Sequence, residues 1–340
     1  MPETQDTIMQ TLGIVGAGAW GTALALTAVR AGRHALLWAH EAEVAQTISA
    51  RGENPVYLPG VALDGVRATA DLADLAGCDA LLLVVPSQFL RAVCRQLRPL
   101  IPAGRPVVVC AKGVEAGSLA AMSELVAEEL PQAPLAVLSG PTFAIEVARG
   151  LPTAITMACA DAALGRRLVK ALGTPSFRPY LTDDVIGAEI GGAVKNVLAI
   201  ACGVVEGRGL GDNARAALIT RGMAELMRLA VAKGARPETC MGLSGLGDLM
   251  LTASSTQSRN YSLGFALGEG KALNDILAAR KSVTEGVASA ASVVGLAGRL
   301  HIEMPICAAV EGLLYRGIGV DDTIRGLLAR PFKSELGFDA

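Results

Sequence analysis

Short apolar runs and longer helix-like segments alternate along the first half of the chain. Six of these runs are continuously apolar rather than alternating, and they lie at residues 12–16, 34–38, 80–85, 106–111, 135–140 and 153–158. Strands buried on both faces have this pattern, because helices cover both sides of a parallel sheet. We therefore predict an α/β domain with a doubly wound, mostly parallel sheet over residues 8–182.

The pattern changes near residue 180. Beyond this point the apolar segments are long, alanine-rich and helix-like, and they lie at residues 185–205, 214–233, 286–300 and 306–315. Two prolines in the sequence PSFRPY interrupt the chain just before the change. A length of 340 residues fits two domains. Because the segments after the change are all helix-like, we predict an all-helical second domain over residues 183–335.

Residues 7–29 contain no charged side chain and are long enough to cross a bilayer. Four glycines lie in the middle of this stretch, and the segment before it, MPETQD, is acidic where a secretory signal would be basic. We expect a strand, a turn and a buried helix here, and no membrane insertion.

The sequence GAGAWG places Gly16, Gly18 and Gly21 in a GxGxxG pattern between an expected strand and an expected helix. In this context the first glycine allows a tight turn, the second allows a pyrophosphate to approach the backbone, and the third allows close helix–strand packing. The free N–H groups at the helix N-terminus favour an anion. We predict a dinucleotide site of the Rossmann type, the alternative being a purely structural turn.

His40 stands about 20 residues further on, where an NAD-specific site would carry an acid for the ribose. A partly protonated imidazole tolerates a 2′-phosphate, while the adjacent Glu41 could accept hydrogen bonds from the diol. We favour use of both cofactors or a preference for NADP. The alternative is that His40 is an exposed loop residue with no cofactor role.

Lys195 is the only charged residue between Glu189 and Glu206. Burial of this helix would lower the pKa of the ammonium, so that the lysine could exchange a proton near neutrality. Beside a ketone it would supply the proton and stabilise the developing alkoxide. The alternative is a buried ion pair with Glu189 or Asp248.

Three loops carry further candidates. The run STQSRNYS presents Ser258, Arg259 and Asn260 at the start of an expected helix, a donor set that suits a phosphate, although a plain helix cap would use the same residues. The turn GLSGLGD ends in Asp248, which could hold a substrate hydroxyl or orient Lys195.

The third loop, SGPTFA, follows an expected strand, at the edge where open α/β sheets bind ligands. Gly140 and Thr142 can offer a backbone N–H and a hydroxyl there. Lys112 follows the preceding strand and lies at the same edge.

Composition narrows the choice of partners. Thirty basic against thirty-two acidic residues give a formal charge of −2, which provides no general attraction for nucleic acid or an anionic membrane. The seven cysteines are scattered, with no CxxC pair to suggest a metal site. We expect buried thiols in a reducing compartment, the cytoplasm, and no metal.

Taken together, GAGAWGTALA, AKGVE, SGPTFA, VKN, GLSGLGDLMLT and STQSRNYSLG resemble bacterial NAD(P)-dependent glycerol-3-phosphate dehydrogenase. The resemblance runs from about Gly13 to Gly317. It implies a cytoplasmic enzyme that uses NADP or NAD to interconvert dihydroxyacetone phosphate and sn-glycerol 3-phosphate, a phosphorylated three-carbon substrate and phospholipid precursor.

The resemblance also implies residue roles. The proton donor and acceptor would be Lys195. The substrate contacts would be Lys112, Gly140, Thr142, Lys195, Asp248, Ser258, Arg259 and Asn260. The cofactor contacts would be Gly16, Gly18, Ala19, Trp20, Gly21, His40, Lys112, Ala144, Arg259, Val283 and Glu285. Three of these positions depart from the family: Ala19 replaces Ser or Asn, His40 replaces Arg, and Thr142 replaces Ser.

Two other functions compete with this one. A related two-domain dehydrogenase acting on a hydroxy acid or ketopantoate would share the fold and the lysine. A non-catalytic NADPH-sensing protein would need neither Lys195 nor a second anion site. The alanine- and glycine-rich helices of the second domain could form a homodimer surface.

Overall fold

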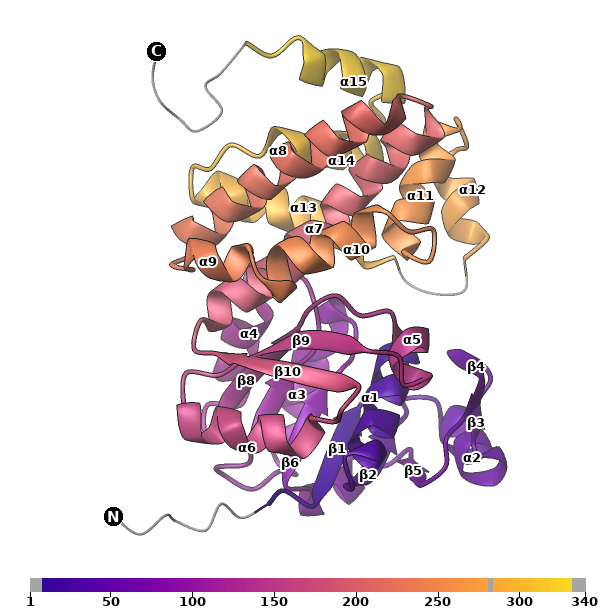
Figure 1. The fold of residues 1–340 in the computed structure, drawn as a ribbon, viewed down its shortest axis with the longest axis vertical. Helices are drawn as coiled ribbons and strands as arrows, with labels where there is room; N and C mark the ends of the chain where they lie inside the picture. The colour runs from indigo at the N-terminus through magenta and orange to yellow at the C-terminus, as the bar shows by residue number, and fades with distance from the viewer. Residues whose placement is uncertain (1–7, 281–283, 332–340) are drawn as a thin grey trace.

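The computed structural model describes residues 8–280 and 284–331. Within these ranges eight strands form one sheet in the first domain (Figure 1). They are β1 (Thr11–Val15), β2 (His34–Trp38), β5 (Val66–Thr69), β6 (Ala80–Leu83), β7 (Val107–Val109), β8 (Leu135–Ser139), β9 (Thr153–Ala158) and β10 (Phe177–Thr182). The spatial order is β10-β9-β8-β7-β6-β1-β2-β5, and every neighbouring pair is parallel except β8 and β9. The mostly parallel sheet is therefore confirmed.

All six apolar runs contain strands, whereas β5 and β10 were not predicted from the sequence. These two strands lie at the two edges of the sheet, and each is only partly buried, so neither has a continuous apolar run. β10 also contains Pro179, which has no backbone N–H to donate. An edge strand tolerates a proline because one of its sides has no neighbouring strand to receive a hydrogen bond. β3 (Glu53–Asn54) and β4 (Leu58–Ala62) form a short hairpin separate from this sheet.

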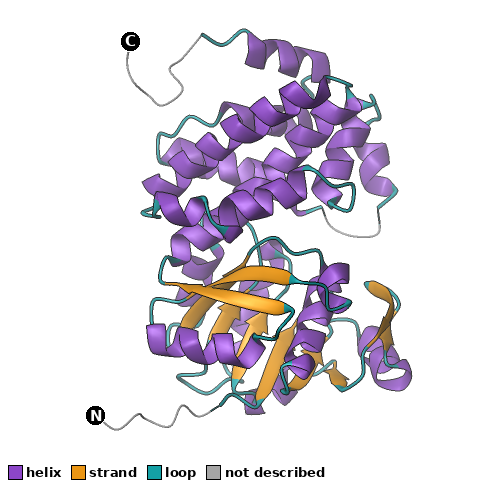
Figure 2. Ribbon diagram, in the orientation of Figure 1, coloured by secondary structure: helices purple, strands orange, loops and turns teal. Residues whose placement is uncertain are grey.

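Helices cover both faces of the sheet (Figure 2). Along β1, Ile14 packs in one core with Leu24 of α1, while Val15 packs in another with Val93 of α3. Both side chains are fully buried, which explains why the strand is apolar at successive positions. The helices of this domain are α1 (Ala19–Arg30), α2 (Ala42–Arg51), η1 (Leu72–Gly77), η2 (Ser87–Phe89), α3 (Leu90–Leu97), α4 (Met122–Glu129), α5 (Ala144–Ala148) and α6 (Ala162–Leu172).

The second domain is helical throughout its described residues, as the sequence predicts. It begins after β10 ends at Thr182. Its helices are α7 (Val185–Gly207), α8 (Gly211–Ala232), α9 (Pro237–Cys240), the π-helical turn η3 (Leu243–Gly247), α10 (Asp248–Ala253), α11 (Arg259–Gly268), α12 (Leu273–Ala278), α13 (Glu285–Arg299), α14 (Pro305–Tyr315) and α15 (Val320–Leu328).

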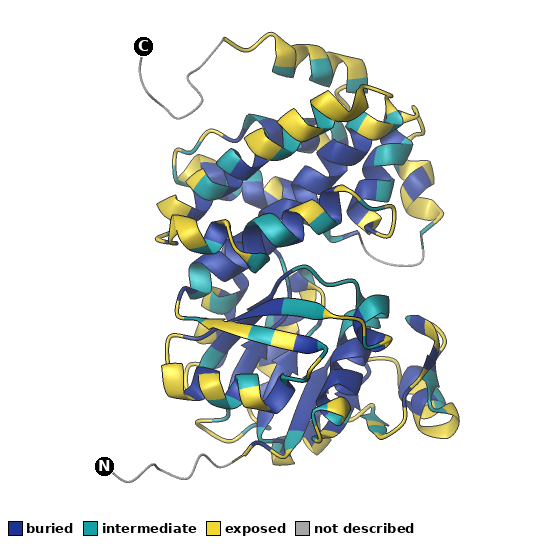
Figure 3. Ribbon diagram, in the orientation of Figure 1, coloured by how far each residue is buried: buried dark blue, intermediate teal, exposed yellow. Residues whose placement is uncertain are grey.

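Helix α7 is the core of this domain (Figure 3). It is the one described helix long and apolar enough to cross a membrane, but 83% of that stretch is buried inside the protein. α8, α10, α11, α13 and α14 all pack against it. The described part of the uncharged stretch, residues 8–29, contains β1 and nearly all of the buried helix α1, as expected.

Helices α7 and α11 pack backbone against backbone. A Cβ added at Gly264 of α11 would lie 1.9 Å from the carbonyl oxygen of Ile200 on α7. Only a residue without a side chain allows this approach. The contact holds the N-terminus of α11, with its candidate site residues, beside α7.

We expect Gly264→Ala to lower the free energy of unfolding by about 3 kcal/mol, because the added methyl overlaps a backbone atom rather than a movable side chain. Gly298→Ala is the matched control, since its Cβ meets no atom within 4 Å. The control should leave stability unchanged or raise it by up to about 1 kcal/mol. Urea unfolding measures both, and equal stabilities for the two variants would contradict the close α7–α11 contact.

Candidate active site

The candidate site lies where the carboxyl edge of the sheet meets the helical domain (Figure 1). Lys112 follows β7, and Gly140 and Thr142 follow β8. Lys195 and Asp248 come from α7 and α10 of the second domain. Ligands of open α/β sheets bind outside this edge, so the sheet residues stand at the expected place.

Asp248 joins the two domains. Its Oδ1 accepts a hydrogen bond from Lys195 Nζ at 2.5 Å, and its Oδ2 accepts one from Lys112 Nζ at 2.7 Å. The Asp248 side chain is only 1% exposed. Two ammonium groups from different domains therefore share one buried carboxylate.

Both lysines make a second hydrogen bond that fixes their direction. Lys195 Nζ donates to Oγ1 of Thr252 at 2.9 Å, and Lys112 Nζ donates to the carbonyl oxygen of Gly140 at 3.1 Å. Thr142 Oγ1 also donates to that carbonyl, at 3.3 Å. These bonds bring Lys112, Gly140, Thr142, Lys195 and Asp248 into one cluster.

The turn η3 carries Asp248 to this place. It packs directly against α7, where a Cβ added at Gly191 would lie 2.5 Å from the carbonyl oxygen of Ser244. α10 then begins at Asp248, one turn before Thr252. Gly191, one turn before Lys195 on α7, therefore lets the backbone of this turn come close to the helix.

Burial lowers the pKa of Lys195 to about 8. The charge of Asp248 opposes this effect and that of Lys112 adds to it. The ion pair with Asp248 that the sequence left as an alternative does form, and it coexists with a depressed pKa. Glu189 does not pair with Lys195: its carboxylate accepts from the N–H and the hydroxyl of Ser123 on α4.

The glycine turn has the geometry of a dinucleotide site. Gly16 has a φ of +119°, and a Cβ at Gly21 would lie 1.8 Å from the carbonyl oxygen of Gly16. A Cβ at Gly18 would meet no protein atom within 4 Å, so open space lies before the N-terminus of α1. No side chain caps α1, which leaves the N–H groups near Ala19 and Trp20 available to a pyrophosphate. The residues present therefore fit the cofactor.

Two other predicted cofactor residues, Ala144 and His40, lie on or beside elements that neighbour α1 and β1. α5, which begins at Ala144, packs against α1. His40 is exposed just beyond β2, with its ring edge-on to Trp38 at a centroid distance of 6.0 Å. Glu41 accepts a hydrogen bond from the hydroxyl of Tyr57. The cofactor role of His40 stays a prediction.

The residues at the start of α11 have different surroundings. Ser258 caps the helix by accepting from the N–H of Tyr261, as the plain-cap alternative expects. Asn260 is buried and bridges two elements: its Nδ2 donates to Oδ1 of Asn196 and its Oδ1 accepts from the N–H of Gly286. Arg259 is exposed, and its guanidinium makes no hydrogen bond or ion pair to the described residues. It is the member of the three that is free to meet an anion.

Asn196, next to Lys195 on α7, is a candidate site residue that the sequence analysis did not assign. It bonds Asn260 and also donates to Oε2 of Glu285, at 3.5 Å, at the start of α13. Thr252 was missed as well, although its position four residues after Asp248 on a helix would have placed it on the same face. Val283 lies outside the described residues.

Comparison with known proteins identifies the family of this chain. Two family models match, the NAD-dependent glycerol-3-phosphate dehydrogenase N-terminus over residues 11–165 and the C-terminus over residues 184–325. The NAD(P)+ glycerol-3-phosphate dehydrogenase of Rhodospirillum rubrum is 62% identical over 335 residues, which cover 98% of this chain and 96% of that protein.

Among solved structures, glycerol-3-phosphate dehydrogenase from Coxiella burnetii is similar with a TM-score of 0.91 and 41% identity, covering 95% of this chain and 99% of that one. A ketopantoate reductase from Ralstonia eutropha is similar with a TM-score of 0.58 and 17% identity, covering 93% of this chain and 100% of that one, and it shares the fold alone. The matched domains span the glycine turn and the shared carboxylate, and the chain belongs to the NAD-dependent glycerol-3-phosphate dehydrogenase family.

Proposed function

We propose that this chain interconverts dihydroxyacetone phosphate and sn-glycerol 3-phosphate with NAD(P)H or NAD(P)+, and that Lys195 gives and takes the proton. The observation that carries the role of Lys195 is its burial beside Asp248, with a pKa near 8. The bound nicotinamide supplies the hydride in reduction and accepts it in oxidation. The reaction feeds phospholipid synthesis with its glycerol phosphate backbone.

In the direction of reduction, the Lys195 ammonium donates its proton to the ketone oxygen and becomes a neutral amine. In the direction of oxidation, the amine takes the hydroxyl proton back. Both forms of Lys195 are accessible because burial brings its pKa close to the working range. Proton transfer of this kind contributes about 10²–10⁴ to the rate.

Asp248 and Thr252 position this lysine. The carboxylate holds the ammonium from one side and the threonine oxygen holds it from another, so the third N–H is left for the substrate. Lys112 places a second positive charge on the other oxygen of Asp248. That charge helps to stabilise an alkoxide that develops beside Lys195.

Arg259 supplies the contact for the phosphate. Its guanidinium is exposed, while its carbonyl oxygen accepts from Nη1 of Arg280 and its helix is fixed against α7. A guanidinium can bind two phosphate oxygens at once. Ser258 and Asn260 support this contact by holding the helix N-terminus rather than by pointing free donors at the anion.

The glycine turn binds the pyrophosphate of the cofactor, and His40 stands where the choice between NADP and NAD is made. The remaining cofactor contacts that the family resemblance implies are Ala19, Trp20, Lys112, Ala144, Arg259, Val283 and Glu285, and Ala19 departs from the Ser or Asn of the family at its position. All seven cysteines are free and buried, which supports a reducing compartment, the cytoplasm.

Turnover tests the proposed function directly. Purified protein mixed with dihydroxyacetone phosphate should oxidise NADPH, NADH or both, read as loss of absorbance of the reduced cofactor. Lys195→Met should lower kcat by about 10²–10⁴. Lys271→Met is the matched control, because Lys271 is 62% exposed on the surface. No turnover with either cofactor would refute the function, and near-normal turnover of Lys195→Met would refute the role of the lysine.

The pH profile tests the coupling between Lys195 and Asp248. Reduction needs the ammonium, so kcat for reduction should fall as pH rises through about 8, and kcat for oxidation should rise over the same range. In Asp248→Asn the fall should move to lower pH, because the carboxylate charge that supports the ammonium is lost. Asp275→Asn, at an exposed position, should keep the wild-type profile. A profile unmoved by Asp248→Asn would contradict the coupling.

Substrate truncation tests Arg259. Arg259→Ala should raise KM for dihydroxyacetone phosphate by about 10–100-fold, since a charge-assisted hydrogen bond is worth about 1.5–3 kcal/mol. The same variant should leave kcat/KM for dihydroxyacetone, which lacks the phosphate, unchanged. Arg67→Ala, exposed on the edge strand β5, is the control. An equal effect on both ketones would assign Arg259 to the cofactor instead.

A further inference from the structure

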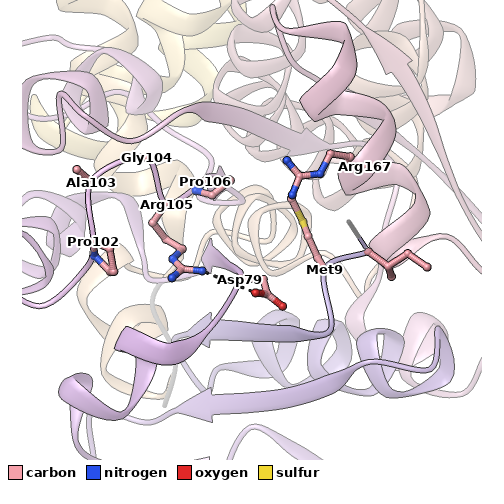
Figure 4. Close-up of a pocket in the computed structure, with 9 residues that line it drawn as sticks. Met9, Asp79, Pro102, Ala103, Gly104, Arg105, Pro106 and Arg167 are labelled. Carbon is pink, nitrogen blue, oxygen red and sulfur yellow. Dashed lines mark ion pairs between the residues drawn. The ribbon is translucent and has the colours of Figure 1, made fainter. Parts of the chain in front are cut away.

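A polar cavity lies at the edge of the sheet opposite the candidate active site (Figure 4). Its volume is about 300 Å³. Residues before three adjacent strands line it: Ile8 and Met9 before β1, Asp79 before β6, and residues 102–106 before β7. Arg167 of α6 completes the wall. These are amino ends of strands, so the cavity is separate from the cluster around Asp248.

Two arginine side chains face this cavity from different elements. In Figure 4, Arg105 and Arg167 approach it from opposite sides, with Asp79 between them. The Nε atoms of both arginines are buried and have no acceptor among the described residues. These Nε atoms are closed off from the cavity itself, so the donors that a ligand there can reach are the terminal Nη groups of the two guanidiniums, which are not buried and make no hydrogen bond to the described residues.

Asp79 does not satisfy these donors. Its Oδ2 accepts from the N–H groups of Gln10 and Thr11, at 2.7 and 2.9 Å, and so holds the start of β1. Its Oδ1 lies 3.9 Å from Nη1 of Arg105, which is too long for a hydrogen bond. Two guanidinium groups against one carboxylate leave the lining with one net positive charge.

We propose that this cavity binds a small organic phosphate. A tetrahedral phosphate offers several acceptor oxygens in different directions, which suits N–H groups that come from two separate guanidiniums. The volume exceeds that of the phosphate group alone, and the exposed side chains of Ile8 and Pro102 provide apolar surface for an organic body. Occupancy links α6 to the starts of β1, β6 and β7 and stabilises the sheet domain.

The arginine Nε–H signals in ¹H–¹⁵N spectra test this proposal on the wild-type protein. The probes are inorganic phosphate, glycerol 2-phosphate and acetate. Both phosphates should shift the Arg105 and Arg167 signals with saturation, glycerol 2-phosphate at lower concentration, while acetate should not. Unmoved signals with both phosphates would overturn the proposal. Saturation with acetate alone would reassign the cavity to carboxylates and overturn it too.

Matched variants provide the second measurement. In a protein carrying both Arg105→Gln and Arg167→Gln, the apparent Kd for glycerol 2-phosphate at this cavity should rise about tenfold or more, and the accompanying increase in Tm should shrink. Arg166→Gln is the control, since Arg166 is an exposed neighbour on the same helix. Equal behaviour of the two proteins would contradict the site. The spectra of the wild-type protein decide the question if the double variant does not fold.

Discussion

The architecture of this protein depends on one buried carboxylate shared between two domains. Asp248 is almost fully buried and accepts hydrogen bonds from Lys195 in its own domain and from Lys112 in the sheet domain. Removing charges from water is costly, and the cost is offset only when partners surround them closely. Here one of the two partners, Lys112, comes from the sheet domain, so the carboxylate has both of its partners only when the two domains are in contact.

The helical packing serves this arrangement. Glycines on α7 and α11 allow backbone-to-backbone contact, which keeps the turn η3 and the N-terminus of α11 against the helix that carries Lys195. A second buried carboxylate, Glu189, lies six residues before Lys195 and binds the N-terminus of α4 in the sheet domain. Burial raises its pKa to about 7. α7 is therefore fixed to the sheet domain at two levels, and both use carboxylates.

Much of the fold could be predicted from the sequence, because buried strands and core helices have strong apolar patterns. β5 and β10 could not be predicted, since edge strands bury only part of their surface. The antiparallel pairing of β9 with β8 could not be predicted either, because the residues of β9 do not differ in type from those of the parallel strands. Lys195 stood out as a lone charge in an apolar helix. Thr252 and Asn196 did not, because small polar residues on helices are common and their partners come from distant segments. The sequence left open whether Ser258 would cap the helix or bind an anion, and it did not show that Asn260 would bond Asn196 on another helix.

The shared carboxylate limits which hybrids can be made by joining the sheet domain of one relative to the helical domain of another. The chain passes from one domain to the other between β10 and α7, where a swap of whole halves between relatives would naturally be made. Such a hybrid inherits Lys112 from one parent and Asp248 from the other, so the charge balance of its centre is decided by two sequences that were never selected together. Each half is a separate stretch of the chain, yet neither half alone holds all three members of the cluster, Lys112, Lys195 and Asp248.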